Sequence, residues 1–216
     1  MEKPHYKLIG YTIWLFIAWS IYVAFVYPLL PKSNSILATV LKESFRFAIF
    51  VVPLFLILKT WNPWKDLSAG KLKGSALLYG LLVACVWMAV TLAIAVFGQN
   101  RGLTAPSLYF WFTGFSFATI VEEFVFRGYV AKQLLGNGKF IAVLVSSLLF
   151  VLIHYPGWII LGMLPSVAAF LIASVSIFLL GLVLGWIFVK FDSVWPCVIV
   201  HAGNNLVAAI TVASAG

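Results

Sequence analysis

Three ionisable residues lie within six positions of one another in an otherwise apolar stretch, residues 119–130, which reads TIVEEFVFRGYV. They are Glu122, Glu123 and Arg127. Residues four apart share one face of a helix, so Glu123 and Arg127 can form an ion pair. Glu122 lies about 100° further round the helix and is out of register with Arg127. Glu122 is therefore a spare acid, and an acid in apolar surroundings needs another polar partner or a wet cavity.

Two further pairs of residues have the same spacing of four. Phe150 and His154 form one pair, and His201 and Asn205 form the other. With a helical rise of about 1.5 Å per residue, these side chains would reach depths in their helices similar to that of Glu122. We therefore expect Glu122, His154, His201 and Asn205 to meet in one layer.

A carboxylate, two imidazoles and an amide can hydrolyse an amide bond without a covalent nucleophile, and we find no serine or cysteine in a nucleophile motif. Glu122 would act as a general base on water, which His154 would help to orient and activate. His201 and Asn205 would donate hydrogen bonds to the developing oxyanion. A second reading is equally open, in which Glu122, His154 and His201 bind a divalent metal such as zinc. No cofactor is certain from the sequence.

The composition determines which elements position these residues. Of the 216 residues, 63% are hydrophobic and 9% are charged, and the mean hydropathy is +1.09. A soluble domain is nearer a quarter charged. The sequence therefore predicts an all-α, polytopic transmembrane helical bundle with no room for a second, soluble domain. Cys85 and Cys197 fall in apolar runs, and we expect both to be buried as small hydrophobic residues.

Apolar segments of the length needed to cross a bilayer occur about seven times, and six to eight spans are compatible with the sequence. The weakest boundary lies near residues 154–166, where HYPGW and Pro165 could bound a kinked or re-entrant piece. Residues 1–106 carry no catalytic motif, whereas residues 107–216 carry all three pairs, and we expect both parts to form one integrated membrane domain. The predicted spans are 8–30, 36–58, 75–97, 107–135, 140–160, 166–190 and 194–215.

The basic residues predict the orientation of the bundle. With the N-terminus in the cytoplasm, only Lys32, Lys42, Arg46 and Arg101 fall on the outer side, and the other ten of the 14 lysines and arginines fall on the inner side. Such an excess favours a cytoplasmic N-terminus. The net charge of +8 is thereby explained by membrane topology rather than by nucleic-acid binding. The compact chain, without a targeting peptide, suggests a bacterial cytoplasmic membrane.

A second polar cluster, KESFR, lies in the predicted span 36–58. Glu43 and Arg46 are three apart and can pair, while Lys42 can extend its amine toward the interface. Two readings are open for Glu43 and Arg46. They form a structural salt bridge, or they belong to a cavity wall that attracts a substrate carboxylate.

The three motifs together carry a resemblance. E-E-x-x-x-R beginning at Glu122, F-x-x-x-H at Phe150 and H-x-x-x-N at His201 resemble the CPBP family. These are CAAX-prenyl-protease and bacteriocin-processing intramembrane endopeptidases, also called Abi proteins. The resemblance implies a helical-bundle protease with a water-filled intramembrane cavity. It implies that Glu122 is the base, that His154 assists it, and that His201 with Asn205 forms the oxyanion site, supported by Glu123, Arg127 and Phe150.

The resemblance also implies the class of partner. Family members process prenylated C-termini, peptide pheromones, bacteriocin leaders or regulatory membrane proteins, so the expected substrate is a membrane-embedded or lipidated peptide in the bilayer. Two other functions remain as alternatives: a non-catalytic membrane scaffold or bacteriocin immunity factor, and a proton-coupled transporter. The sequence does not predict the oligomeric state, the cleavage site or the need for a metal.

Overall fold

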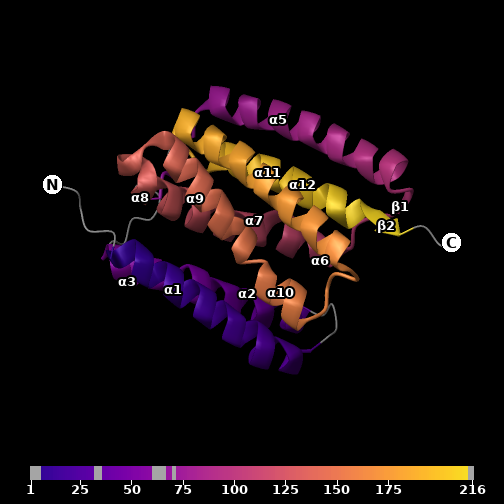
Figure 1. Ribbon diagram of the computed structural model, residues 1–216, viewed down its shortest axis with the longest axis horizontal. Helices are drawn as coiled ribbons and strands as arrows, with labels where there is room; N and C mark the ends of the chain where they lie inside the picture. Colours follow the sequence, from indigo (N-terminus) through magenta and orange to yellow (C-terminus); the bar gives the residue numbers. More distant parts are fainter. Residues whose placement is uncertain (1–5, 32–35, 60–66, 70–71, 214–216) are drawn as a thin grey trace.

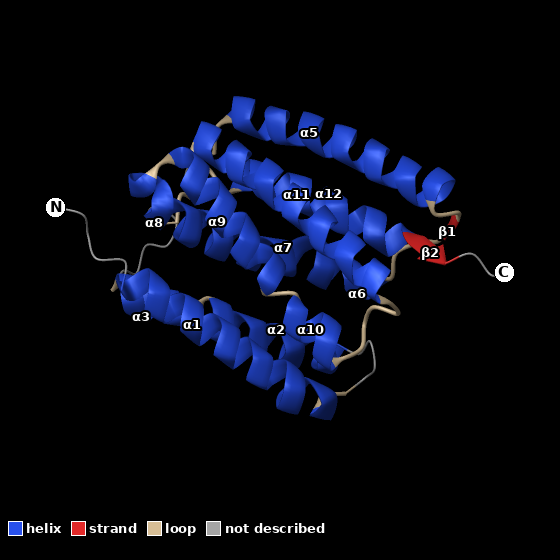
Figure 2. Cartoon of the chain, in the orientation of Figure 1, coloured by secondary structure: helices blue, strands red, loops and turns tan. Residues whose placement is uncertain are grey.

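The computed structural model describes residues 6–31, 36–59, 67–69 and 72–213, and almost all of them are helical. Figure 1 shows long helices running roughly side by side along one axis, and Figure 2 shows that strands are confined to one end. The elements, including the π-helical and 3-10 segments labelled η, are α1 (Tyr6–Ile21), η1 (Tyr22–Val26), η2 (Tyr27–Leu29), α2 (Ile36–Phe50), α3 (Val52–Leu58), α5 (Gly74–Ala93), η3 (Ile94–Gly98), β1 (Arg101–Leu103), α6 (Leu108–Phe110), η4 (Trp111–Phe117), α7 (Ala118–Glu123), η5 (Phe124–Ala131), α8 (Lys132–Leu134), η6 (Leu135–Asn137), α9 (Lys139–Leu152), α10 (Tyr155–Ile160), α11 (Val167–Phe191), α12 (Trp195–Ile210) and β2 (Thr211–Ala213).

Each of the seven predicted spans coincides with a helical segment, but four of these helices are long and apolar enough to cross a membrane by themselves. The other three carry or flank the polar motifs: α2 with α3, the segment from α6 to η6, and the 16-residue α12. The protein is thus an all-α integral membrane protein, and seven remains a predicted number of spans. The four long apolar helices are Tyr6–Leu29, Gly74–Gly98, Lys139–Ile160 and Val167–Phe191.

One expected boundary changes in the structure, and the kink left open near residues 154–166 is found. The helix expected to run to residue 215 ends at Ile210, because Thr211–Ala213 pairs antiparallel with Arg101–Leu103. Thr211 and Val212 are β-branched and suit a strand. The expected kink after α9 is present, since the helix is interrupted at Ile153 and His154 before α10 begins.

The helices pack closely through small residues. In Figure 1, α5 lies along one side of the bundle beside α12, and α1 to α3 lie along the opposite side. A Cβ on Gly80 of α5 would approach Pro196 of α12 to 2.8 Å, and one on Gly181 of α11 would approach Ser147 of α9 to 2.9 Å. Such small residues let membrane helices approach each other closely.

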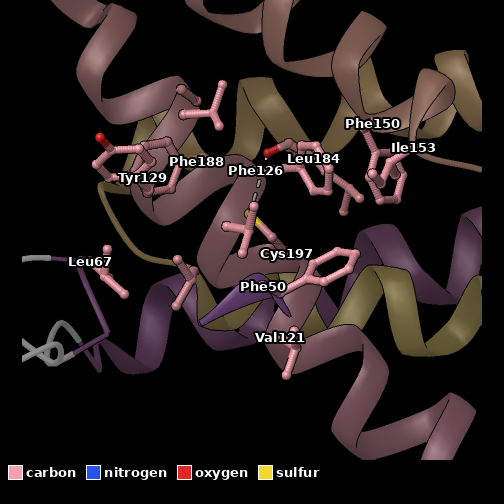
Figure 3. Packing of buried hydrophobic residues seen from close by; sticks show 14 of the residues in the cluster. Phe50, Leu67, Val121, Phe126, Tyr129, Phe150, Ile153, Leu184, Phe188 and Cys197 are labelled. Carbon is pink, nitrogen blue, oxygen red and sulfur yellow. Dashed lines mark hydrogen bonds between the residues drawn. The ribbon is translucent and has the colours of Figure 1, made fainter. Parts of the chain in front are cut away.

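The core lies between these helices. Figure 3 shows Phe126, Phe150, Leu184 and Phe188 packed around Cys197, whose thiol donates to the carbonyl of Leu184 at 3.3 Å. Cys197 is therefore buried as predicted. The prediction is wrong for Cys85, which is exposed on α5, because this helix presents much of its apolar surface outward, where lipid would cover it.

Six of the described basic residues lie at or beside the ends of elements that meet at one end of the bundle, where α1 begins and α3 ends (Figure 1). This basic end, as we call it, also holds a hydrogen-bonded set in which Lys132 donates to Ser68 and Ser68 donates to Asp192. The opposite end holds Arg101 in the strand pair. Lys3, Lys32, Lys65 and Lys71, on which the predicted orientation partly depends, lie outside the described residues. The basic end comprises Lys7, Lys59, Lys73, Lys132, Lys139 and Lys190.

Candidate active site

The two adjacent glutamates lie at the end of α7, where the backbone passes into the π-helical η5. Glu123 is fully buried, whereas the Glu122 side chain is 16% exposed and lines a cavity. The two neighbouring carboxylates therefore differ, because that of Glu123 is buried in the protein and that of Glu122 lines the cavity. The π-helical segments η4 and η5 on either side of α7 were not predicted. π-Helical turns are frequent at functional sites.

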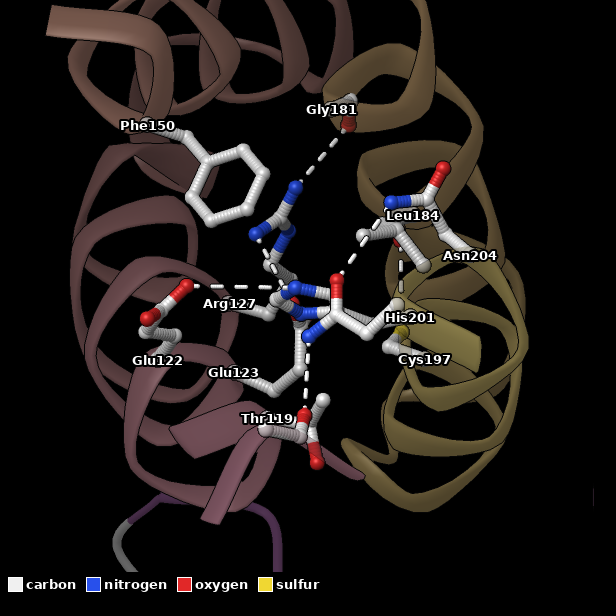
Figure 4. Close-up of polar contacts among 12 residues, drawn as sticks. Thr119, Glu122, Glu123, Arg127, Phe150, Gly181, Leu184, Cys197, His201 and Asn204 are labelled. Atoms are coloured by element: carbon white, nitrogen blue, oxygen red, sulfur yellow. Dashed lines mark hydrogen bonds and ion pairs between the residues drawn. The ribbon is translucent and has the colours of Figure 1, made fainter. Parts of the chain in front are cut away.

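Glu123 forms an ion pair with Arg127, as the spacing of four predicts, with 3.1 Å between Oε1 and Nη1. Arg127 is also fully buried. Its Nη2 donates to the carbonyl oxygen of Gly181 at 3.3 Å, and its guanidinium lies 4.4 Å from the centre of the Phe150 ring. These contacts join α7 and η5 to α9 and α11, so the arginine connects several helices behind the cavity (Figure 4).

His201 from α12 lies between the two glutamates (Figure 4). Its Nδ1 is 2.8 Å from Oε1 of Glu123, and its Nε2 is 3.8 Å from Oε2 of Glu122. A carboxylate paired with arginine only accepts hydrogen bonds, so Nδ1 of His201 is the donor in the shorter contact. The imidazole is thereby fixed with Nε2 turned toward Glu122.

Phe150 and His154 contribute from α9 and the break that follows it. Nδ1 of His154 lies 2.7 Å from the carbonyl oxygen of Phe150, so this nitrogen donates. The Phe150 ring is buried and makes perpendicular contacts with both imidazoles, at 5.2 Å to His154 and 5.4 Å to His201. Phe150 therefore separates and orients the two histidines.

The two asparagines of α12 have different contacts. Nδ2 of Asn205 donates to the carbonyl oxygen of Gly114 in η4 at 2.9 Å. Asn204 accepts a hydrogen bond from Nε1 of Trp87 on α5 at 3.1 Å. Asn204 thus makes a contact between helices, while Asn205 lies with His201 on the side of α12 that lines the cavity.

A cavity of about 380 Å³ connects the candidate residues. Glu122, His154, His201 and Asn205 all line it, whereas Glu123, Arg127 and Phe150 lie behind its wall. The remaining walls are largely aromatic and aliphatic, and they come from α1, η1, α2, α10 and α11. The structure therefore brings together the four residues expected to meet in one layer.

The second polar cluster reaches the same cavity. Lys42, Glu43 and Arg46 of α2 all line it. Nη1 of Arg46 lies 3.6 Å from Oε2 of Glu43, which is an ion pair beyond ordinary hydrogen-bond length. The predicted pair is thus present and forms part of the cavity wall, while the attraction of a substrate carboxylate stays a prediction.

The metal reading has a geometric test. Over the part of the chain that the structure describes, no group of three or more His, Cys, Asp and Glu side chains is placed to hold an ion. In this arrangement Glu122, His154 and His201 do not converge on one point, so the residues do not fit a three-ligand zinc site as they stand. The metal-dependent reading remains a prediction for experiment.

The contacts between helices at this site could not be found from sequence spacing. The bond between His201 and Glu123 joins residues 78 positions apart, and Gly114 and Gly181 contribute backbone oxygens that no side-chain motif indicates. The only sequence signal for them is that glycine permits a close approach.

Comparison with known proteins gives one family. Residues 104–207 match the family described as type II CAAX prenyl endopeptidase Rce1-like, and this range contains all seven candidate residues. No curated protein matches the chain, and no solved structure matches it. Since the match covers the three motifs, the cavity-lining acid, histidines and asparagine belong to the matched part. Over residues 104–207 the chain is therefore similar to the Rce1-like type II CAAX prenyl endopeptidases, in agreement with the CPBP family that its motifs resemble.

Proposed function

We propose that the protein is an intramembrane endopeptidase that hydrolyses a peptide bond of a membrane-associated peptide by a glutamate-type mechanism. The observation that carries the proposal is His201 held between a buried and a cavity-lining glutamate. The match of residues 104–207 to the Rce1-like family supports a CAAX-type protease. The apolar, aromatic cavity walls support a substrate that arrives with a lipid group or a membrane-embedded segment.

The two histidines have different capacities because of their hydrogen bonds. His154 donates from Nδ1 to Phe150, so in the neutral ring its Nε2 is an acceptor that can orient a water molecule. His201 donates from Nδ1 to Glu123, so its Nε2 donates only when the ring is doubly protonated. The proposed mechanism uses His201 in this doubly protonated form, in which Nδ1 donates to Glu123 and Nε2 is free to donate to an oxyanion.

The reaction follows from these capacities. Glu122 takes a proton from a water molecule that His154 orients, and the oxygen attacks the carbonyl carbon of the scissile bond. Nε2–H of His201 and the second amide hydrogen of Asn205 stabilise the oxyanion, since Nδ2 of Asn205 uses only one hydrogen on Gly114. Glu122 then passes its proton to the leaving nitrogen. The C–N bond breaks to give a carboxyl group and an amine.

The test compares cells that express the wild type with cells that express Glu122→Gln at equal membrane levels. New peptide termini in the membrane and the culture fluid are catalogued by mass spectrometry. We expect a set of termini with the wild type that is lost with Glu122→Gln and kept with Cys85→Ser, an exposed site on α5. Identical catalogues and an unchanged cellular phenotype for Glu122→Gln would contradict hydrolysis and favour the scaffold.

A further inference from the structure

Three charged side chains of α2 line the same cavity as Glu122 and the two histidines. Lys42 and Arg46 are four apart and share a helix face, and both line the cavity with Glu43. α2 packs against α7, which carries Glu122. The cationic wall and the catalytic acid thus belong to neighbouring helices around one cavity.

The charges of this wall are not balanced within it. Two cations and one anion leave one net positive charge. The Arg46–Glu43 contact of 3.6 Å is an ion pair without a hydrogen bond, and Oε2 of Glu43 has no hydrogen-bond partner among the residues that the structure describes. The Arg46 side chain is 24% exposed, so its remaining N–H groups are accessible from the cavity.

Aromatic rings hold the two cations in place. Nζ of Lys42 lies 5.5 Å from the centre of the Tyr27 ring, and Cζ of Arg46 lies 6.0 Å from that of Trp19. Such contacts lower the cost of placing a cation in a poorly hydrated site. They do not neutralise the charge, so the site retains its attraction for an anion.

We propose that Lys42 and Arg46 form an anion subsite that receives the C-terminal carboxylate of the peptide substrate. The planar guanidinium can bind a carboxylate with two parallel hydrogen bonds. A cavity of about 380 Å³ holds a short peptide end rather than a long chain. This proposal rests on the proposed function, because it takes the peptide to lie in the cavity with its scissile bond at Glu122.

The experiment measures binding separately from hydrolysis. Glu122→Gln protein is placed in phosphatidylcholine liposomes and titrated with N-palmitoylated, dansyl-labelled peptides of mixed sequence. Each peptide is made with a free C-terminal carboxylate and as the C-terminal amide. We expect the carboxylate form to bind about tenfold more tightly, the scale of one charge-assisted hydrogen bond.

The preference should depend on the subsite. In the Glu122→Gln background we expect Arg46→Gln and Lys42→Gln each to reduce it and the double substitution to abolish it. Arg46→Lys should keep part of it. Because Arg46→Gln leaves Glu43 unpaired, Glu43→Gln with Arg46→Gln serves as a second variant with no unpaired charge, and it should also lose the preference. Lys139→Gln, at the exposed start of α9 in the basic end, should change nothing.

Three results would overturn the proposal. They are equal binding of acid and amide, no saturable binding of the acid, and a preference that survives loss of both cations. A phosphate headgroup offers the same chemistry, so phosphatidylglycerol is tested as a competitor. The substitutions of Lys42 and Arg46 could reduce competition by phosphatidylglycerol and leave the affinity difference between the acid and amide peptides unchanged. The subsite would then bind lipid, and the carboxylate assignment would be wrong. If the preference for the free carboxylate is present but the wild type hydrolyses no peptide, only the proposed function is contradicted.

Discussion

His201 Nδ1 lies 2.8 Å from Oε1 of Glu123, the same oxygen that is paired with Arg127. The buried acid therefore has two partners and connects η5 to α12. Because His201 also faces Glu122, the orientation of the imidazole to which we assign the oxyanion depends on a residue outside the cavity. Glu123 is in this sense a positioning residue, and its role extends beyond the helix-internal pair that the sequence predicts.

This dependence predicts different effects on stability and on activity. Glu123→Gln leaves the fully buried Arg127 without a counter-charge, and breaking a buried pair costs on the order of 3–5 kcal/mol. Adding Arg127→Gln removes the unpaired charge, so we expect the double variant to recover part of the thermal stability in detergent. We expect it to remain inactive, with the loss in kcat rather than KM, because His201 has lost its carboxylate acceptor.

The outcome that contradicts this role is a double variant that recovers activity together with its melting temperature. Glu123 would then serve stability alone. Tyr11→Phe is a suitable control, since it removes a buried hydrogen bond to the carbonyl oxygen of Phe50 without touching the carboxylates. We expect that variant to lose some stability and to keep the catalytic rate per folded molecule.

Treatment with a chelator distinguishes the glutamate-type mechanism from the metal-dependent mechanism, both of which the sequence leaves open. If Glu122 acts directly on water, hydrolysis by the purified enzyme should survive 1,10-phenanthroline at a concentration that strips zinc from control proteases. Loss of activity that zinc restores would instead show that Glu122, His154 and His201 rearrange around a metal. Measuring bound zinc in the wild type and in His154→Gln gives a readout that does not depend on hydrolysis.

The sequence predicts much of this molecule because helical spacing and hydrophobicity are local properties. The four-residue spacings of Glu123 with Arg127 and Phe150 with His154 hold in the structure, as do the seven helical segments. Contacts between helices depend instead on rotation and close approach. For this reason the bond between His201 and Glu123 was not predicted.

Local departures from regular helix were also missed. The strand pair that ends α12 depends on Thr211 meeting Leu103, which is a long-range contact. The π-helical turns beside α7 carry no signal in the sequence of η5 that distinguishes it from ordinary helix. The exposure of Cys85 follows from the position of α5 at the edge of the bundle.

The close contact between α9 and α11 allows a test of whether their packing stabilises the protein and the position of Arg127. Gly181 and Gly185 are four apart on α11, and a Cβ on Gly185 would lie 3.0 Å from Val143. Gly181→Val would push Ser147 away and shift the carbonyl that accepts from Arg127. Overpacking of this kind costs roughly 1–3 kcal/mol, so we expect a melting temperature lower by about 2–12 °C.

Gly10→Val is the matched control, because no atom lies within 4 Å of a Cβ added at Gly10. We expect this variant to melt close to the wild type. Equal melting temperatures for the two valine variants would show that α9 and α11 adjust without cost. A normal melting temperature with lost activity in Gly181→Val would point to the Arg127 contact alone.

The cavity and the basic end lie toward opposite ends of the bundle, which predicts the side from which substrate arrives. Tyr27 and Met163, the more exposed lining residues, follow the ends of η1 and α10, away from the basic end. Basic ends face the cytoplasm. In a Cys85→Ala background, with Cys197 buried, we expect a membrane-impermeant maleimide to label Met163→Cys in intact cells and Lys139→Cys only after permeabilisation.

That pattern would place the cavity mouth on the outer side and make an exported peptide, or an outer segment of a membrane protein, the fitting substrate. The reverse pattern would show that the N-terminus lies outside and that the basic residues do not determine the orientation. A cytoplasmic prenylated peptide would then reach the cavity directly. Labelling of both positions in intact cells would show that the reagent crosses the membrane. A Cys85→Ala protein without added cysteine is carried through each step to measure background labelling.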